Sequence, residues 1–175
     1  VDAQSALRAL SYTGADGIMV PRVETLEQVK TAVESMNFAP VGRLGCGGHA
    51  QYRADEDATY FKRMLALQIE SPVGIANLPE MLEKYGEYIS VIVIGPYDLT
   101  VTSGIPMQFD DPLLEKEVRE IFDISAAHGV PAGIFCDNAE SAHKYIDMGA
   151  SFIWLGLDTN IFMDGFNRLY DAVGK

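Results

Sequence analysis

Basic side chains are scarce in this 175-residue chain: 13 Lys and Arg stand against 25 Asp and Glu, a formal net charge of −12. Nucleic acids and anionic membranes bind proteins through basic patches, so this balance argues against both as partners. No apolar run approaches the roughly 20 residues that span a bilayer. The opening residues, VDAQSALRAL, have neither the basic start nor the apolar segment of a signal peptide. We therefore expect a cytoplasmic protein.

Cysteine is equally scarce, with Cys46 and Cys136 far apart and matching no zinc spacing. We expect reduced thiols, although two cysteines can also form one disulfide. Low-complexity tracts, Pro/Ser linkers and repeats are missing too, so residues 1–175 are predicted to form a single domain. The chain also lacks an initiator Met, which indicates a processed or truncated piece.

What the chain does contain is an alternation of short apolar runs and helical patterns. The runs predict strands at 17–23, 65–70, 90–95, 131–137 and 151–158. Helical spacing predicts helices at 2–13, 24–36, near 55–63, 73–85 (with Pro79 as a break or a fresh start), 111–129, 139–149 and 160–173. Because the strands are continuously apolar rather than alternating, they are expected to form a parallel sheet covered on both faces.

Two α/β architectures fit this order. Five parallel strands can form a doubly wound open sheet, or about five-eighths of a (β/α)8 TIM barrel, which takes about 250 residues. The pattern alone does not choose between them. Both architectures place function at the carboxyl ends of the strands, so the polar residues found there are the candidates for a site: Arg22, Gln68, Glu70, Asp98, Asp137 and Asp158.

Glu70 and Asp98 are the strongest of these candidates. Asp137 and Asp158 are interpreted as N-caps of the helices that follow them, whereas Ser71 already supplies a cap beside Glu70. Two carboxylates at the tips of neighbouring strands would repel each other unless a cation lay between them. Carboxylates with water and a chelating substrate form the oxygen-rich site that Mg²⁺ or Mn²⁺ prefers.

The other motifs favour less specific interpretations. The loop GRLGCGGH (42–49) lacks the ending of a phosphate-binding loop, and His49, His128 and His143 are interpreted as non-catalytic. Phe152 and Trp154 are interpreted as core residues. No lysine falls at a strand end, so a Schiff-base mechanism has no candidate.

Five segments together resemble the HpcH/HpaI aldolase family, which consists of metal-dependent pyruvate aldolases related to the β-type citrate lyase enzymes. The segments are GADGIMVPRVETLEQV, LQIES, VIVIGPYDLT, PAGIFCDN and FIWLGLDT, and the resemblance covers essentially the whole chain. It implies a TIM barrel of the phosphoenolpyruvate/pyruvate type, of which this chain supplies about five βα units, strands 4–8. It also implies that the earlier units, which carry the family's catalytic arginine and histidine, are missing.

The resemblance also implies roles for particular residues. Glu70 and Asp98 would hold a divalent metal (Mg²⁺, Mn²⁺ or Co²⁺), and Gln68 would line the catalytic site. The backbone from Gly95 through Pro96 to Tyr97 would receive the pyruvate carboxylate, and Phe135 would contact substrate. Two departures are visible: Tyr97 replaces a small residue, and Arg43 is displaced by one position within the glycine loop.

The expected function is therefore a class II carbon–carbon lyase that splits a 4-hydroxy-2-keto acid into pyruvate and an aldehyde. The alternatives are a citrate-lyase-like enzyme acting on an acyl-CoA and a non-catalytic remnant that binds metal or keto acid. The apolar helix at 160–173 and the family resemblance predict a homo-oligomer, a hexamer built as a trimer of dimers.

Overall fold

The computed structural model describes residues 15–37, 39–43 and 63–174. The helices predicted at 2–13 and near 55–63, most of the glycine-rich loop, Cys46 and His49 lie outside the described residues.

The fold is built on five parallel strands that follow one another across the sheet in sequence order. They are β1 (Gly17–Val20), β2 (Met64–Ile69), β3 (Val91–Ile94), β4 (Ala132–Cys136) and β5 (Phe152–Leu155). A doubly wound sheet requires a point where the strand order reverses, and the described strands contain none. Sequential right-handed crossovers keep every connecting helix on one side, as in a barrel wall. The structure thus selects the partial barrel over the open sheet.

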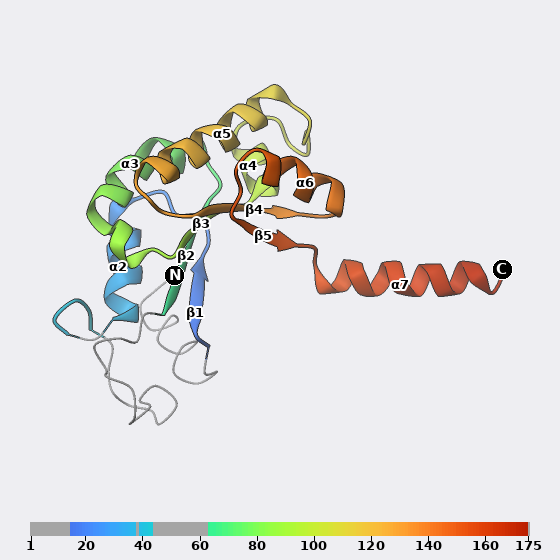
Figure 1. Ribbon diagram of the computed structural model, residues 1–175, viewed down its shortest axis with the longest axis horizontal. Coiled ribbons are helices and arrows are strands. Elements are labelled where there is room, and N and C mark those ends of the chain that lie inside the picture. The colour runs from blue at the N-terminus through green and yellow to red at the C-terminus, as the bar shows by residue number, and fades with distance from the viewer. Residues whose placement is uncertain (1–14, 38, 44–62, 175) are drawn as a thin grey trace.

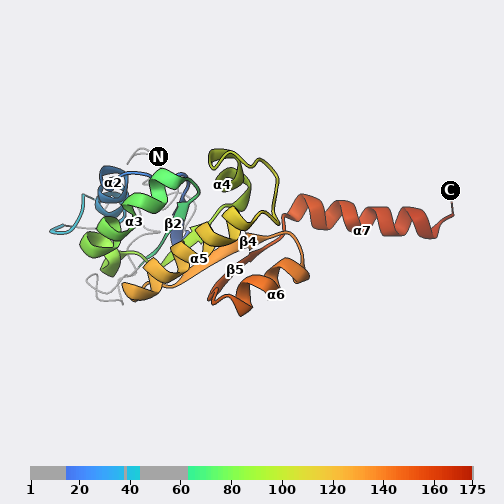
Figure 2. The ribbon, with the colours of Figure 1, turned by 90° about the horizontal axis from the view of Figure 1, so that it is seen from above.

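Four helices cover the outer face of the sheet: α2 (Leu26–Met36), α3 (Pro72–Tyr85), α5 (Pro112–Ala127) and α6 (Ala139–Asp147) (Figures 1 and 2). Thr25, Ser71 and Asp111 cap the first three with side-chain hydrogen bonds, as residues of these types do. The break expected at Pro79 is wrong, because α3 continues through it.

The core is divided unequally between the two faces. Large buried residues such as Leu67, Ile94 and Ile134 pack against the helices on the outer face. The inner face carries only a small buried cluster of Ala66, Val91 and Val93, with Met19 and Phe152 packed against it. Because successive side chains alternate along a strand, Gln68 and Glu70 share the face of Ala66, and Gly95 shares that of Val93. The inner face therefore carries these candidate site residues.

Coverage on both faces is confirmed for the middle strands, where β3 and β4 are buried throughout. The prediction that both faces are covered is wrong toward the end of the sheet. Trp154 in β5 is exposed, because β5 pairs with β4 alone among the described strands. Trp154 is therefore not a core residue.

Two elements differ from the prediction. A short helix, α4 (Pro96–Thr102), follows β3 directly, and a 3-10 turn, η2 (Gly86–Tyr88), precedes β3.

The last helix, α7 (Asp158–Ala172), extends away from the other described elements, with all of its residues exposed (Figure 1). None of the helices in the described part of the chain has the length and apolar character needed to cross a membrane.

Candidate metal and substrate site

Glu70 is a buried carboxylate just past the end of β2, with an exposed fraction of 2%. Its Oε1 accepts a hydrogen bond of 2.9 Å from the backbone N–H of Arg22. Its Oε2 is buried, and no described residue donates a hydrogen bond to it. Burial and the negative charge of Asp98 raise the pKa of Glu70 to about 7. The hydrogen bond and charge of Arg22 and the side chain of Gln68 act in the opposite direction and offset part of this rise. One oxygen of this carboxylate is therefore available to a ligand.

Asp98 lies near Glu70 but on a different kind of element from the one expected. It occupies the first turn of α4, three residues beyond Gly95, and is not at the tip of β3. Gly95-Pro96 begins this helix, with Pro96 at its first position, which is a recognised start signal. Asp98 is half-exposed, and its Oδ1 lies 3.5 Å from Nη1 of Arg22.

Arg22 connects the two carboxylates, through its backbone to Glu70 and through its side chain to Asp98. Its φ is 50°, in the left-handed region that non-glycine residues rarely adopt. The sequence placed Arg22 at a strand end but gave no sign of either contact, because both partners are far away in the chain.

Gly95 lets Gln68 and Glu70 approach the end of β3. A Cβ built at Gly95 would collide with Oε2 of Glu70 and lie 2.5 Å from Nε2 of Gln68. Only glycine leaves this space open. The close approach explains how residues from two strands form one site.

The described residues fit a divalent metal that would take only some of its ligands from them. No cluster of three or more His, Cys, Asp or Glu residues able to hold a metal occurs among them. Glu70 and Asp98 nevertheless offer carboxylate oxygens of the kind that Mg²⁺ and Mn²⁺ select. The unpartnered Oε2 of Glu70 agrees with such a ligand. Water and substrate would complete the coordination.

A row of aromatic side chains lies beside this pair. Tyr97 packs edge-on against Phe109 (4.8 Å between ring centroids) and Phe135 (6.0 Å), and Phe135 packs against Trp154 (5.3 Å). The Tyr97 hydroxyl donates a 2.7 Å hydrogen bond to Asp137. The sequence suggested that Asp137 caps α6, and this prediction is wrong: the N-cap of α6 is Asn138.

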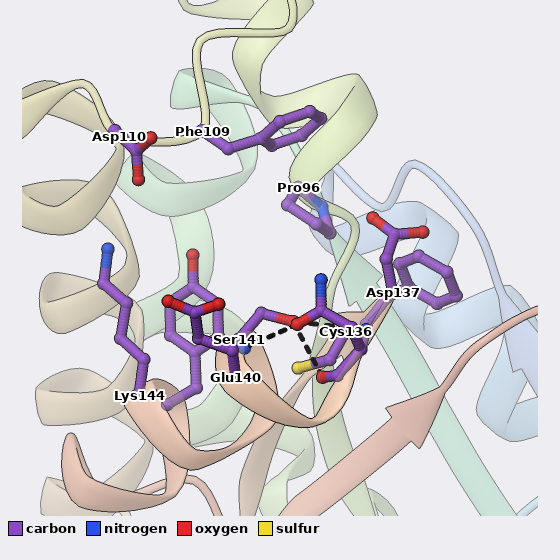
Figure 3. Close-up of a pocket in the computed structure, with 11 residues that line it drawn as sticks. Pro96, Phe109, Asp110, Cys136, Asp137, Glu140, Ser141 and Lys144 are labelled. Atoms are coloured by element: carbon purple, nitrogen blue, oxygen red, sulfur yellow. Dashed lines mark hydrogen bonds between the residues drawn. The ribbon is translucent and has the colours of Figure 1, made fainter.

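A cavity of about 370 Å³ opens next to this aromatic row (Figure 3). Pro96, Phe109, Phe135, Asp137 and Lys144 are among its lining residues. Three of these, Phe109, Phe135 and Asp137, also contact Tyr97. Tyr97 thus contacts the wall of the cavity, and Asp98 is the next residue in the chain.

The remaining candidates lie apart from these residues. Asp158 is in the first turn of α7, where it accepts a hydrogen bond from the Thr159 N–H, and Leu157 is the N-cap, so the capping prediction is wrong. His128 caps the end of α5, with its Nδ1 2.8 Å from the carbonyl oxygen of Ile124. His143 is exposed on α6.

The raised pKa of Glu70 predicts a pH dependence of stability in the metal-free protein. The ordinary pKa of a glutamate is 4.5. Between that pH and about 7, Glu70 in the folded protein keeps a proton that the unfolded chain has released. Stability is therefore greatest below this range and falls as the pH rises through it, by up to about 3 kcal/mol. Urea unfolding with a chelator at pH 5 and pH 8 measures the fall. In Glu70→Gln this contribution should vanish; an unchanged difference between the two pH values would contradict it.

A curled sheet of parallel strands with helices outside, and polar groups gathered just beyond the carboxyl ends of β2 and β3, defines an α/β barrel-type protein with its candidate site at the barrel mouth. Residues 3–165 match the model of the HpcH/HpaI aldolase/citrate lyase family, and the chain belongs to that family.

Relatives and solved structures agree with this assignment. A 5-keto-4-deoxy-D-glucarate aldolase of Escherichia coli O6:H1 is 30% identical over 97% of this chain and 68% of its own length. The HpcH/HpaI aldolase of Desulfitobacterium hafniense superposes with a TM-score of 0.88 at 21% identity, covering all of this chain and 70% of its own. A family protein of Burkholderia cenocepacia superposes with a TM-score of 0.85 at 23% identity, covering 99% and 70%. The chain therefore has the partial barrel fold and belongs to a family of lyases.

Proposed function

We propose that this protein is a divalent-metal-dependent aldolase that cleaves or forms a carbon–carbon bond in a 4-hydroxy-2-keto acid, giving pyruvate and an aldehyde. The observation that supports it most is the buried Oε2 of Glu70, which no described residue partners, facing the gap that Gly95 leaves. A buried carboxylate oxygen without a partner costs stability and is retained where it binds a ligand.

In this proposal Glu70 and Asp98 would hold Mg²⁺, Mn²⁺ or Co²⁺, which would supply Lewis-acid chemistry toward the keto acid. The first-turn N–H groups of α4, those of Tyr97 and Asp98, have no partner within the helix and receive the substrate carboxylate. Pro96 has no N–H and shapes this turn instead. Gln68 lies against Gly95 and orients the keto acid.

The aromatic side chains are proposed to enclose the aldehyde portion of the substrate. Phe135 is 7% exposed and packs between Tyr97 and Trp154, so it offers a fixed apolar surface there. The name of the relative from Escherichia coli indicates that it acts on a hydroxylated keto sugar acid. We propose a hydroxylated keto acid for this protein as well.

A pyruvate assay on the intact gene product tests the function. We expect the protein to release pyruvate from a 4-hydroxy-2-keto acid, which a coupled lactate dehydrogenase assay measures. We also expect slower decarboxylation of oxaloacetate. Both activities should be lost with a chelator and restored by Mn²⁺. Metal and pyruvate binding without turnover would instead favour the non-catalytic remnant. We also propose that the described strands are the last five of a barrel whose earlier units complete the catalytic groups.

Assembly is predicted to depend on α7. Exposed apolar side chains on this helix include Ile161, Phe162, Phe166 and Leu169, each at least 54% exposed. Such a surface is unusual unless another surface covers it. We expect a homo-oligomer, a trimer of dimers, in which α7 packs on a neighbouring subunit.

The double variant Phe162→Glu, Leu169→Glu is expected to dissociate the oligomer, because it places charges in an apolar contact. Light scattering at micromolar concentration measures the mass. Asp164→Glu on the same helix is the matched control and should keep the wild-type mass. A monomeric wild type would contradict the prediction.

A further inference from the structure

Arg22 combines a strained backbone with a charged side chain at the site. Its φ of 50° is a conformation that Gly or Asn adopts at lower cost than Arg. Strained residues of this kind concentrate at functional sites. The backbone accounts for the conformation, because the Arg22 N–H reaches Oε1 of Glu70. It does not account for the arginine side chain.

Stability does not explain the side chain either. The contact between Nη1 of Arg22 and Oδ1 of Asp98 is 3.5 Å long, and the two side chains are 59% and 51% exposed. An exposed, single-contact ion pair of this kind contributes little. A residue that strains the backbone and stabilises little is better explained by what it does to the charge of the site.

The charges give Arg22 two opposed effects. With Glu70 and Asp98 ionised, Arg22 leaves the site with a net charge of −1, which a divalent cation changes to +1. Arg22 repels that cation and occupies an oxygen of Asp98, so it weakens metal binding. The loaded site keeps one positive charge, however, and attracts an anion of charge −1, such as a keto acid.

We infer that Arg22 is a positioning residue that exchanges partners: it pairs with Asp98 while no cation is bound, and it attracts the carboxylate of the substrate once the cation holds Asp98. This inference rests on the proposed function. It predicts effects of opposite sign on the metal and on the substrate, which a merely structural residue would not produce.

The test uses Arg22→Asn, because Asn tolerates the left-handed backbone while removing the charge. In calorimetry on the intact gene product, this variant should bind Mn²⁺ about threefold to tenfold more tightly. With saturating Mn²⁺ present, it should bind pyruvate about tenfold more weakly. Its thermal midpoint should equal or exceed that of the wild type, since the strain is relieved.

Two further variants complete the design. Arg22→Lys keeps the charge and should restore most of the pyruvate affinity. Arg119→Gln removes an arginine that pairs with Glu115 on α5 and should change neither affinity. Unchanged affinities in Arg22→Asn, or a loss of both, would overturn the inference while leaving the proposed function intact. A wild type that binds no Mn²⁺, or binds pyruvate equally well without it, would overturn both.

Discussion

Glu70→Gln is expected to lower the metal-dependent rate of pyruvate release by at least about 10³-fold. Its amide cannot supply the negative charge of the carboxylate, and a catalytic metal contributes several kcal/mol to stabilising the transition state. Mn²⁺ affinity should fall in parallel by calorimetry, and Asp98→Asn should behave in the same way. Stability should move in the opposite direction, because the variant no longer buries a carboxylate whose pKa is raised to about 7. At pH 8 and without metal, Glu70→Gln should therefore be more stable than the wild type.

Glu117→Gln provides the matched control, since Glu117 is also a buried carboxyl group, with an exposed fraction of 8%. It accepts hydrogen bonds of 2.8 and 3.0 Å from the Ser103 hydroxyl, and burial raises its pKa. Its replacement should change stability but leave Mn²⁺ affinity and turnover within about twofold, since it lies outside the site. Wild-type Mn²⁺ affinity in a folded Glu70→Gln, Asp98→Asn double variant would refute the proposed metal site.

Gly95→Ala should be nearly as damaging, although it changes no charge and adds a single methyl group. The new Cβ would enter the space held by Oε2 of Glu70 and the amide of Gln68, so both side chains must move. Displacements of about 1 Å at a catalytic site cost on the order of 10²-fold in rate. We expect kcat/KM and Mn²⁺ affinity each to fall about 100-fold, with a loss of stability of about 1–3 kcal/mol from overpacking.

Gly165→Ala is the control for this experiment. Gly165 lies within α7, where an added Cβ meets no atom within 4 Å. Alanine in a helix interior is favoured over glycine by about 1 kcal/mol, so activity should be retained. A Gly95→Ala protein with wild-type metal affinity would show that Glu70 can move without losing its ligand.

The class of fold and the two acids were accessible from the sequence because their signals are local. Continuous apolar runs such as those of β3 and β4 indicate buried parallel strands wherever they occur. Ser71 was recognised as a cap for the same reason, since a capping residue bonds within its own turn. Glu70 and Asp98 stood out because each follows an apolar run in the sequence, and because two carboxylates on neighbouring strands would repel each other without a cation.

Tertiary structure decided everything that depends on contacts between distant segments. The sequential strand order, which distinguishes a barrel wall from a doubly wound sheet, follows from how crossovers pack and leaves no mark on any single strand. Asp137 was expected to cap the next helix, yet it accepts a hydrogen bond from Tyr97, 40 positions away in the chain. Arg22 reaches Glu70 and Asp98 across 48 and 76 positions. The local sequence pattern predicts which residues are buried in strands and which charged residues follow them. Only the packing of whole elements brings the charges of Arg22, Glu70 and Asp98 together.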